Sequence, residues 1–145
     1  MPPPTISIII HGRDDEYVEN FIEMISFTIN FIAAGCYSQN IQNRIEIVLV
    51  DWGSVSSFIP KIFHDLKLHK SSIVNGHYVD NETIKKLDGD SPYHVSKAVN
   101  FGMRKAKGDY VLILTGNTII PELHLVRLLS LIDGRDHLLP NAKEI

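Results

Sequence analysis

Residues 98–121 read AVNFGMRKAKGDYVLILTGNTIIP, and this stretch decides the fold. A helical pattern stops at Gly108, the apolar run Tyr110–Leu114 predicts a buried strand, and the residues TGNT at 115–118 predict a turn directly after it. A strand that is apolar throughout is typical of a parallel sheet with both faces covered. In such sheets, ligands bind beyond the carboxyl ends of the strands.

Two earlier segments repeat this pattern. Residues 6–10 (ISIII) predict a first strand that ends in HGR at 11–13, and residues 45–50 (IEIVLV) predict a second strand that ends in DWGS at 51–54. Because the carboxyl ends of parallel strands meet at one edge, we expect these two turns and the turn at 115–118 to converge on one rim.

Apolar residues at a 3.6-residue period predict helices between these strands. The first helix is expected to be capped by Asp14 or Asp15 and to stop at Gly35. Its apolar positions are Val18, Phe21, Ile22, Ile25, Ile29 and Ile32. Alternating strands and helices predict an α/β fold, with a mostly parallel sheet covered by helices on both faces.

Proline marks the start of three further helices. Pro60 opens a short helix, the pair at 91–92 caps a helix that runs through Lys107, and Pro121 opens the last helix. The inward positions of that last helix are Leu125, Leu128, Leu129 and Ile132.

The middle of the chain gives weaker signals. Residues 72–74 predict a third strand, Asn75-Gly76 predicts a turn, and residues 80–90 are polar enough to predict a mobile loop.

Composition limits the function classes. A chain of 145 residues with 44% hydrophobic and 21% charged residues fits one domain spanning 1–145. The net charge of −3 gives no field that attracts nucleic acid, so we expect no nucleic-acid partner. Cys36 is the single cysteine, which excludes an intrachain disulfide and a thiolate zinc cluster and favours a reducing compartment.

The N-terminal residues predict a cytoplasmic protein. The sequence MPPP lacks the basic region and the cleavage site of a signal peptide. The apolar stretch 24–36 is broken by polar residues and is shorter than the roughly 20 residues that cross a bilayer. We therefore expect no membrane span.

Three segments, taken in order, resemble the nucleotide-binding half of a family 2 glycosyltransferase with the GT-A fold. They are 6–13 as the first strand and turn, 46–54 as the strand that ends in Asp-x-Gly-Ser, and 97–121. The last is similar to the family's Asn-x-Gly helix, Ala-x-Gly-Asp-Tyr stop and strand leading to the Asp-x-Asp motif. The resemblance covers nearly the whole chain and implies a truncated or minimal Rossmann-like nucleotide-diphospho-sugar transferase. The G-x-G-x-x-G and P-loop patterns are absent, which disfavours dehydrogenases and P-loop NTPases.

The resemblance implies a nucleotide-sugar site on the predicted rim. Asp51 would accept a hydrogen bond from the imide N–H of a uracil or thymine base, or would only stabilise its own turn. Trp52 would pack beside the base or be a buried edge aromatic. His11 and Gly12 would line the pocket for the base and ribose, and Arg13 would reach a phosphate or remain an exposed turn residue.

Two cations or potential cations begin the helix that carries Asn100. His94 and Lys97 are placed to approach the base or the diphosphate, where a positive charge offsets the phosphate charge. The alternative for Lys97 is a solvated helix face.

The position of the metal motif departs from the family. The Asp-x-Asp motif would fall on Thr115-Gly116-Asn117, where neither carboxylate is present. Mg²⁺ and Mn²⁺ prefer charged oxygen ligands, so a Mn or Mg cofactor is doubtful, with Asn117 standing at the degenerate position.

Three functions remain open. The first is a glycosyltransferase that takes a sugar from a nucleotide donor, a UDP-sugar above others, to an unknown acceptor. The second is a catalytically inactive nucleotide-sugar-binding relative or a partner subunit. The third is another doubly wound phosphoryl-binding domain. An exposed apolar sheet edge would be compatible with a homo-oligomer or a partner subunit.

Overall fold

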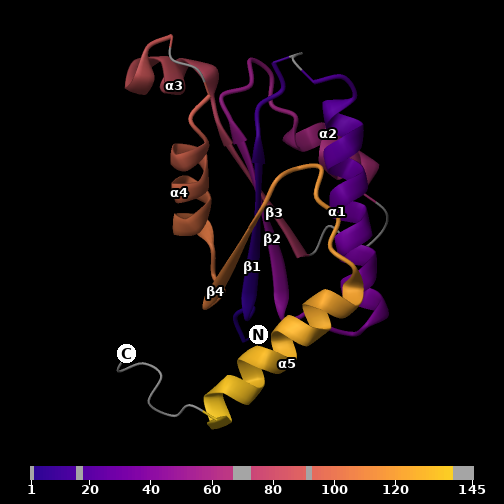
Figure 1. The fold of residues 1–145 in the computed structure, drawn as a ribbon. Helices are drawn as coiled ribbons and strands as arrows, with labels where there is room; N and C mark the ends of the chain where they lie inside the picture. Colours follow the sequence, from indigo (N-terminus) through magenta and orange to yellow (C-terminus); the bar gives the residue numbers. More distant parts are fainter. Residues whose placement is uncertain (1, 16–17, 67–72, 91–92, 139–145) are drawn as a thin grey trace.

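A parallel sheet in the order β3-β2-β1-β4 organises the chain (Figure 1). The structure is a computed structural model that describes residues 2–15, 18–66, 73–90 and 93–138. Its strands are β1 (Ile6–Gly12), β2 (Ile45–Trp52), β3 (Val74–Val79) and β4 (Tyr110–Leu114). Every neighbouring pair in this sheet is parallel, which confirms the predicted parallel sheet.

Helices cover both faces of the sheet (Figure 1). Helices α1 (Phe21–Ser38), α2 (Ile59–Asp65) and α5 (Glu122–Leu138) supply side chains to the core on one face. Helices α3 (Asn81–Asp88) and α4 (Val95–Lys105) supply side chains to the core on the other face. The predicted α/β fold with two covered faces is therefore confirmed.

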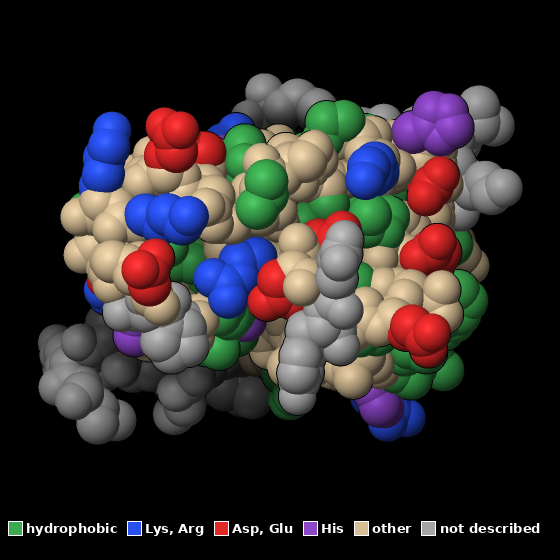
Figure 2. All heavy atoms as spheres, turned by 90° about the horizontal axis from the view of Figure 1, so that it is seen from above, with side chains coloured by type: hydrophobic (Ala, Val, Ile, Leu, Met, Phe, Trp, Pro, Cys, Tyr) green, Lys and Arg blue, Asp and Glu red, His purple; other side chains and the backbone are tan. Residues whose placement is uncertain are grey.

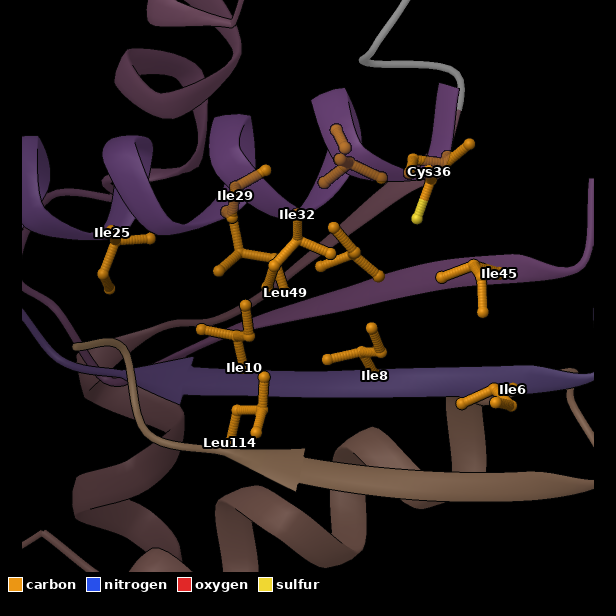
Figure 3. Close-up of a cluster of buried hydrophobic side chains, with 14 of the residues drawn as sticks. Ile6, Ile8, Ile10, Ile25, Ile29, Ile32, Cys36, Ile45, Leu49 and Leu114 are labelled. Carbon is orange, nitrogen blue, oxygen red and sulfur yellow. The ribbon is translucent and has the colours of Figure 1, made fainter. Parts of the chain in front are cut away.

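The larger core lies between the sheet and α1 (Figure 3). Alternate residues of a strand point to opposite faces, so Ile8 and Ile10 of β1 face α1. Ile25 and Ile29 of α1 pack against these two residues and are fully buried. Burying each of these side chains contributes about 1.5–3 kcal/mol, which makes this face the main source of stability.

Helix α1 also passes a length and composition test for a membrane-spanning helix, the one described helix to do so, with a mean hydropathy of 1.3. Its apolar residues Ile25, Ile29 and Ile32 are buried against the sheet. A core helix accounts for the same composition.

On the other face, α4 lies directly on β1 and β2. A Cβ atom on Gly102 would lie 2.8 Å from Ile9 Cγ2 and 3.2 Å from Val50 Cγ2. Because residue 102 is glycine, α4 packs closely against β1 and β2. This packing positions the N-terminus of α4 at the carboxyl edge of the sheet.

A buried carboxylate ties the amino ends of the strands together. Glu46 is 4% exposed and accepts hydrogen bonds from Ser7 Oγ at 2.5 Å and Asn75 Nδ2 at 3.0 Å. It also accepts one from the backbone N–H of Lys107 at 2.5 Å. These bonds join β1, β2, β3 and the segment before β4, and Glu46, Asn75 and Lys107 line a hollow of about 420 Å³ at this edge, opposite the predicted rim.

The first helix begins and ends later than its sequence predicts. It starts at Phe21 after Asn20, which has a left-handed φ of 56°, so the predicted caps Asp14 and Asp15 lie before the helix. It continues through Gly35 to Ser38, because Gly35 packs against Glu122 of α5, where a Cβ would lie 2.8 Å from Glu122 Cβ. Glycine here serves helix packing rather than termination.

The predicted turn at Asn75-Gly76 is wrong, because both residues lie within β3. A Cβ on Gly76 would lie 2.6 Å from Ile59 Cγ2, so this glycine makes room for α2. The predicted loop at 80–90 is also wrong, because it contains α3, capped by the Asp80 carboxylate, which accepts a hydrogen bond from the Thr83 N–H at 2.7 Å.

Smaller differences concern α4 and α5. Helix α4 ends at Lys105 rather than Lys107, and the predicted cap at 91–92 lies outside the described residues. In α5, Leu125 and Leu129 are buried as predicted, whereas Leu128 is 37% exposed.

The prediction that Tyr110–Leu114 is a buried strand is wrong, because β4 forms an edge of the sheet and its apolar residues are incompletely covered. Val111 and Ile113, which share the face of Ile9, are 38% and 48% exposed. On the opposite face, Tyr110 and Leu112 line a hollow of about 280 Å³ beside Leu131 and other residues of α5. The expected exposed apolar sheet edge is therefore present at β4.

Replacing Gly102 by valine tests the packing of α4. The new side chain meets Ile9 and Val50 in a closed contact, so we expect the free energy of unfolding to fall by about 1–3 kcal/mol in chemical denaturation. Gly134→Ala is the control, because a Cβ there meets nothing within 4 Å and alanine favours a helix. Equal stability of Gly102→Val and the original chain would contradict the described contact.

Candidate nucleotide site

The three predicted turns meet at the carboxyl edge of the sheet. The register places Ile10 beside Leu114 and Gly12 beside Asp51, so β1 lies between the two other turns. From β1 the chain moves outward to β2 and β3, then returns to the other side of β1 with β4. The end of β1 beside β4 is thus the point where the winding reverses, which is where such sheets bind ligands.

Seen from above, the described residues of this edge form no large patch of one charge (Figure 2). Lys and Arg side chains lie intermingled with Asp and Glu side chains, in keeping with the net charge of −3. Any ligand held here is therefore bound by individual side chains rather than by a broad field.

Asp51 is fully buried at the end of β2. Its carboxylate accepts hydrogen bonds from the backbone N–H of Ser54 at 3.2 Å and of Phe58 at 3.0 Å. Burial raises the pKa of Asp51, while the hydrogen bonds from Ser54, Phe58 and Ser57 act in the opposite direction. These hydrogen bonds stabilise the turn after β2, which is one of the two roles predicted for Asp51. A hydrogen bond between Asp51 and a nucleotide base would have to compete with them.

Gly12 and Trp52 also serve packing at this edge. A Cβ on Gly12 would lie 2.5 Å from Phe21 Cζ, so this glycine admits the start of α1. The Trp52 ring is 6% exposed, and its centroid lies 5.7 Å from that of Phe101. In this arrangement Trp52 belongs to the core beneath the rim.

His11 is joined to an aromatic residue that the sequence analysis did not single out. Its Nδ1 lies 2.6 Å from the hydroxyl oxygen of Tyr93, and the two ring planes differ by 21°. The Arg13 guanidinium lies over the Tyr93 ring, with Cζ 5.5 Å from the centroid. Burial lowers the pKa of His11 and raises that of Tyr93, so both side chains are held neutral at pH 7.

Lys97 and His94 lie on the same side of the edge, at the start of α4. Lys97 Nζ donates to Asp88 Oδ1, whose side chain is 5% exposed at the end of α3. His94 is the N-cap residue of α4 and makes no side-chain capping bond. The charge of Lys97 is therefore offset by a nearly buried carboxylate that the sequence did not reveal.

Thr115 and Asn117 form a small hydrogen-bonded turn at the end of β4. Thr115 Oγ1 donates to Asn117 Oδ1 at 2.8 Å and lies 2.5 Å from Thr118 Oγ1. The turn leans toward α1, where Thr28 Oγ1 donates to the Gly116 carbonyl at 2.7 Å. Asn117 also lines a hollow of about 510 Å³ beside the start of α1.

These residues do not fit a divalent cation. Thr115 and Asn117 offer neutral oxygens that are engaged with each other. Within 2–15, 18–66, 73–90 and 93–138, no group of three or more His, Cys, Asp or Glu residues could hold a metal ion. Mg²⁺ and Mn²⁺ call for carboxylate oxygens, so this turn lacks the donor set for them.

The structure thus divides the predicted site residues into two groups. His11, His94 and Lys97 border the side of the edge that α4 covers, whereas Gly12 and Asp51 face α1 and the turn of Thr115 and Asn117 leans toward α1. Tyr93 and Asp88 join the first group and were missed. The sequence predicted that Tyr93 lies inside the helix following the cap at 91–92, so its position before the observed start of α4 was not foreseen.

Asp51→Ala tests the structural role of the carboxylate. It leaves the N–H groups of Ser54 and Phe58 without an acceptor, so we expect the free energy of unfolding to fall by about 2–4 kcal/mol. Asp109→Ala, at an exposed position before β4, is the matched control and should change stability by less than about 0.5 kcal/mol. A folded Asp51→Ala variant of unchanged stability would instead free this carboxylate for a ligand role.

Comparisons with known proteins support the fold. No protein-family model and no curated protein matches the chain. Among solved structures, the crystal structure of S. aureus TarS 1–349, a glycosyltransferase, is similar with a TM-score of 0.56 and 18% sequence identity. The match covers 91% of this chain and 33% of that chain, so this chain spans about a third of the TarS chain. The chain therefore has a glycosyltransferase-like α/β fold of the Rossmann-like GT-A type.

Proposed function

We propose that this chain binds a nucleoside-diphosphate sugar, a UDP-sugar above others, for transfer of the sugar to an acceptor. The observation that carries the proposal is a glycosyltransferase-like fold with the cluster of His11, Arg13 and Tyr93 at its winding reversal. A flat aromatic ring, a neutral imidazole and a guanidinium are suited to a base, a ribose and a diphosphate respectively.

The diphosphate would lie toward the N-terminus of α4. This helix begins at Val95 and has no acidic residue in its first turn. Its unpaired N–H groups and positive dipole end favour an anion. Lys97 and Arg13 add positive charge from two sides of the same region, although each has a carboxylate neighbour.

We further propose that donor binding does not require a divalent cation. Thr115 and Asn117 stand where the resembled family has its Asp-x-Asp motif, and neither carries a carboxylate. The negative charge of the diphosphate would then be balanced by Arg13, Lys97 and the α4 N-terminus. In this proposal, positive groups of the chain take the role of the Mn or Mg ion that the sequence left doubtful.

A non-catalytic donor-binding protein or a partner subunit is the second candidate. The exposed apolar residues Val111 and Ile113 of the β4 edge are the observation in its favour, because open sheet edges are normally paired or covered. Release of free sugar from the bound donor separates the two candidates, since only a transferase activates the bond between sugar and diphosphate.

Calorimetric titration with UDP tests donor binding and its metal dependence together. We expect binding with the same dissociation constant, within about twofold, in Mn²⁺ and in EDTA, because the balancing charges belong to the chain. Lys97→Ala should weaken binding about three- to tenfold, the scale of one charge-assisted contact. Lys61→Ala, an exposed lysine of α2 on the other face, is the matched control.

The outcomes separate the two parts of the proposal. Absence of binding to UDP and to other nucleoside diphosphates would overturn donor binding. Binding that disappears in EDTA would keep donor binding and overturn the metal-independent site.

A further inference from the structure

The Arg13 guanidinium covers one face of the Tyr93 ring, and a ligand group can bind to the same face in its place. The guanidinium Cζ lies 5.5 Å from the centroid of the ring. The salt bridge from Arg13 to Asp15 is long, at 3.4 Å, and the side chains of Arg13 and Asp15 are 20% and 44% exposed. A salt bridge of this length with a half-exposed carboxylate contributes little, so it does not by itself hold Arg13 on the ring.

Tyr93, in contrast, is held in place. Its hydroxyl is bonded to His11 Nδ1 at 2.6 Å, and its ring packs against the apolar cluster beneath α3 and α4. His11 belongs to β1, a strand that is paired on both sides. The ring is therefore a fixed flat surface at the winding reversal, with the Arg13 guanidinium over it.

We infer that Tyr93 is the platform on which the nucleotide base stacks, and that Arg13 holds this place in the empty protein. When the base arrives, Arg13 moves from the ring to the diphosphate of the same ligand. This inference rests on the proposed function and assigns two residues within it. Both steps are non-covalent.

Two physical arguments favour the exchange. Stacking of a nucleic-acid base on an aromatic ring is of the same strength as a partly buried cation–π contact, so the base can take the place of the guanidinium once Arg13 gains a charged partner. The displaced Arg13 exchanges a neutral ring for a charged diphosphate, to which its planar fork of donors is matched. Lys97 is less suited to this movement, because it is paired with the nearly buried Asp88.

The exchange makes opposite predictions for a nucleoside and a nucleotide. Affinities for uridine and for UDP are measured in EDTA by ligand-observed NMR and calorimetry. For Arg13→Ala we expect UDP binding to weaken about tenfold, through the lost charged contact, while uridine binding is unchanged or up to about threefold tighter, because the ring is already free. Arg104→Ala, an exposed arginine at the other end of α4, is the matched control and should alter neither affinity.

Tyr93 variants test the platform itself. Tyr93→Leu keeps an apolar side chain against the core but removes the ring, and should weaken both uridine and UDP about tenfold. Tyr93→Phe keeps the ring and removes only the bond to His11, so it should retain most of the affinity for both ligands. Circular dichroism and thermal unfolding verify that each variant is folded.

Failure of this inference is distinct from failure of the proposed function. If the original chain binds UDP but Arg13→Ala weakens uridine and UDP equally, or weakens neither, the exchange is overturned. If Tyr93→Leu binds uridine as well as the original chain, the platform is overturned. If the original chain binds no nucleoside diphosphate, the proposed function falls and this inference falls with it.

Discussion

The burial of β1 on both faces is the constraint on which the rest of the structure depends. Ile8, Ile9 and Ile10 are all fully buried, and the strand is hydrogen-bonded to β2 on one side and to β4 on the other. A strand so enclosed has no freedom to slip, because a shift of one residue would exchange the side chains of its two faces. The position of His11, at the end of this strand, is fixed by the same packing.

The proposed function rests on what this strand holds at its end. His11 orients Tyr93 through one short hydrogen bond, and Tyr93 carries Arg13 on its ring. The N-terminus of α4 overlies the same region because Gly102 lets the helix approach β1 and β2. At the opposite edge of the sheet, the Glu46 carboxylate is engaged by hydrogen bonds from Ser7, Asn75 and the Lys107 N–H, which join the strands to one another.

The sequence predicted what is local and failed where distant contacts decide. Apolar runs predicted β1, β2 and β4 and their common edge, but only β1 and β2 are buried on both faces, because β4 lies at an edge of the sheet. Gly35 was misinterpreted as a helix stop and Gly76 as part of a turn. Both glycines instead make room for close neighbours, Glu122 and Ile59, that are distant in sequence. At the site, the hydrogen bonds of Asp51 are short in range and its turn role was one of the two alternatives, whereas the pairing of His11 with Tyr93 spans 82 residues and left no periodic signal.

The central claim is that a nucleoside diphosphate binds at the carboxyl edge of the sheet on the α4 side. The most direct test is titration of the isotope-labelled chain with UDP, followed by backbone amide chemical shifts. The account predicts the largest changes at 11–13 and at 93–97, with little change around Glu46 and Asn75 at the opposite edge. Changes centred on Glu46, or confined to the hollow beside α1 that Asn117 lines, would contradict it.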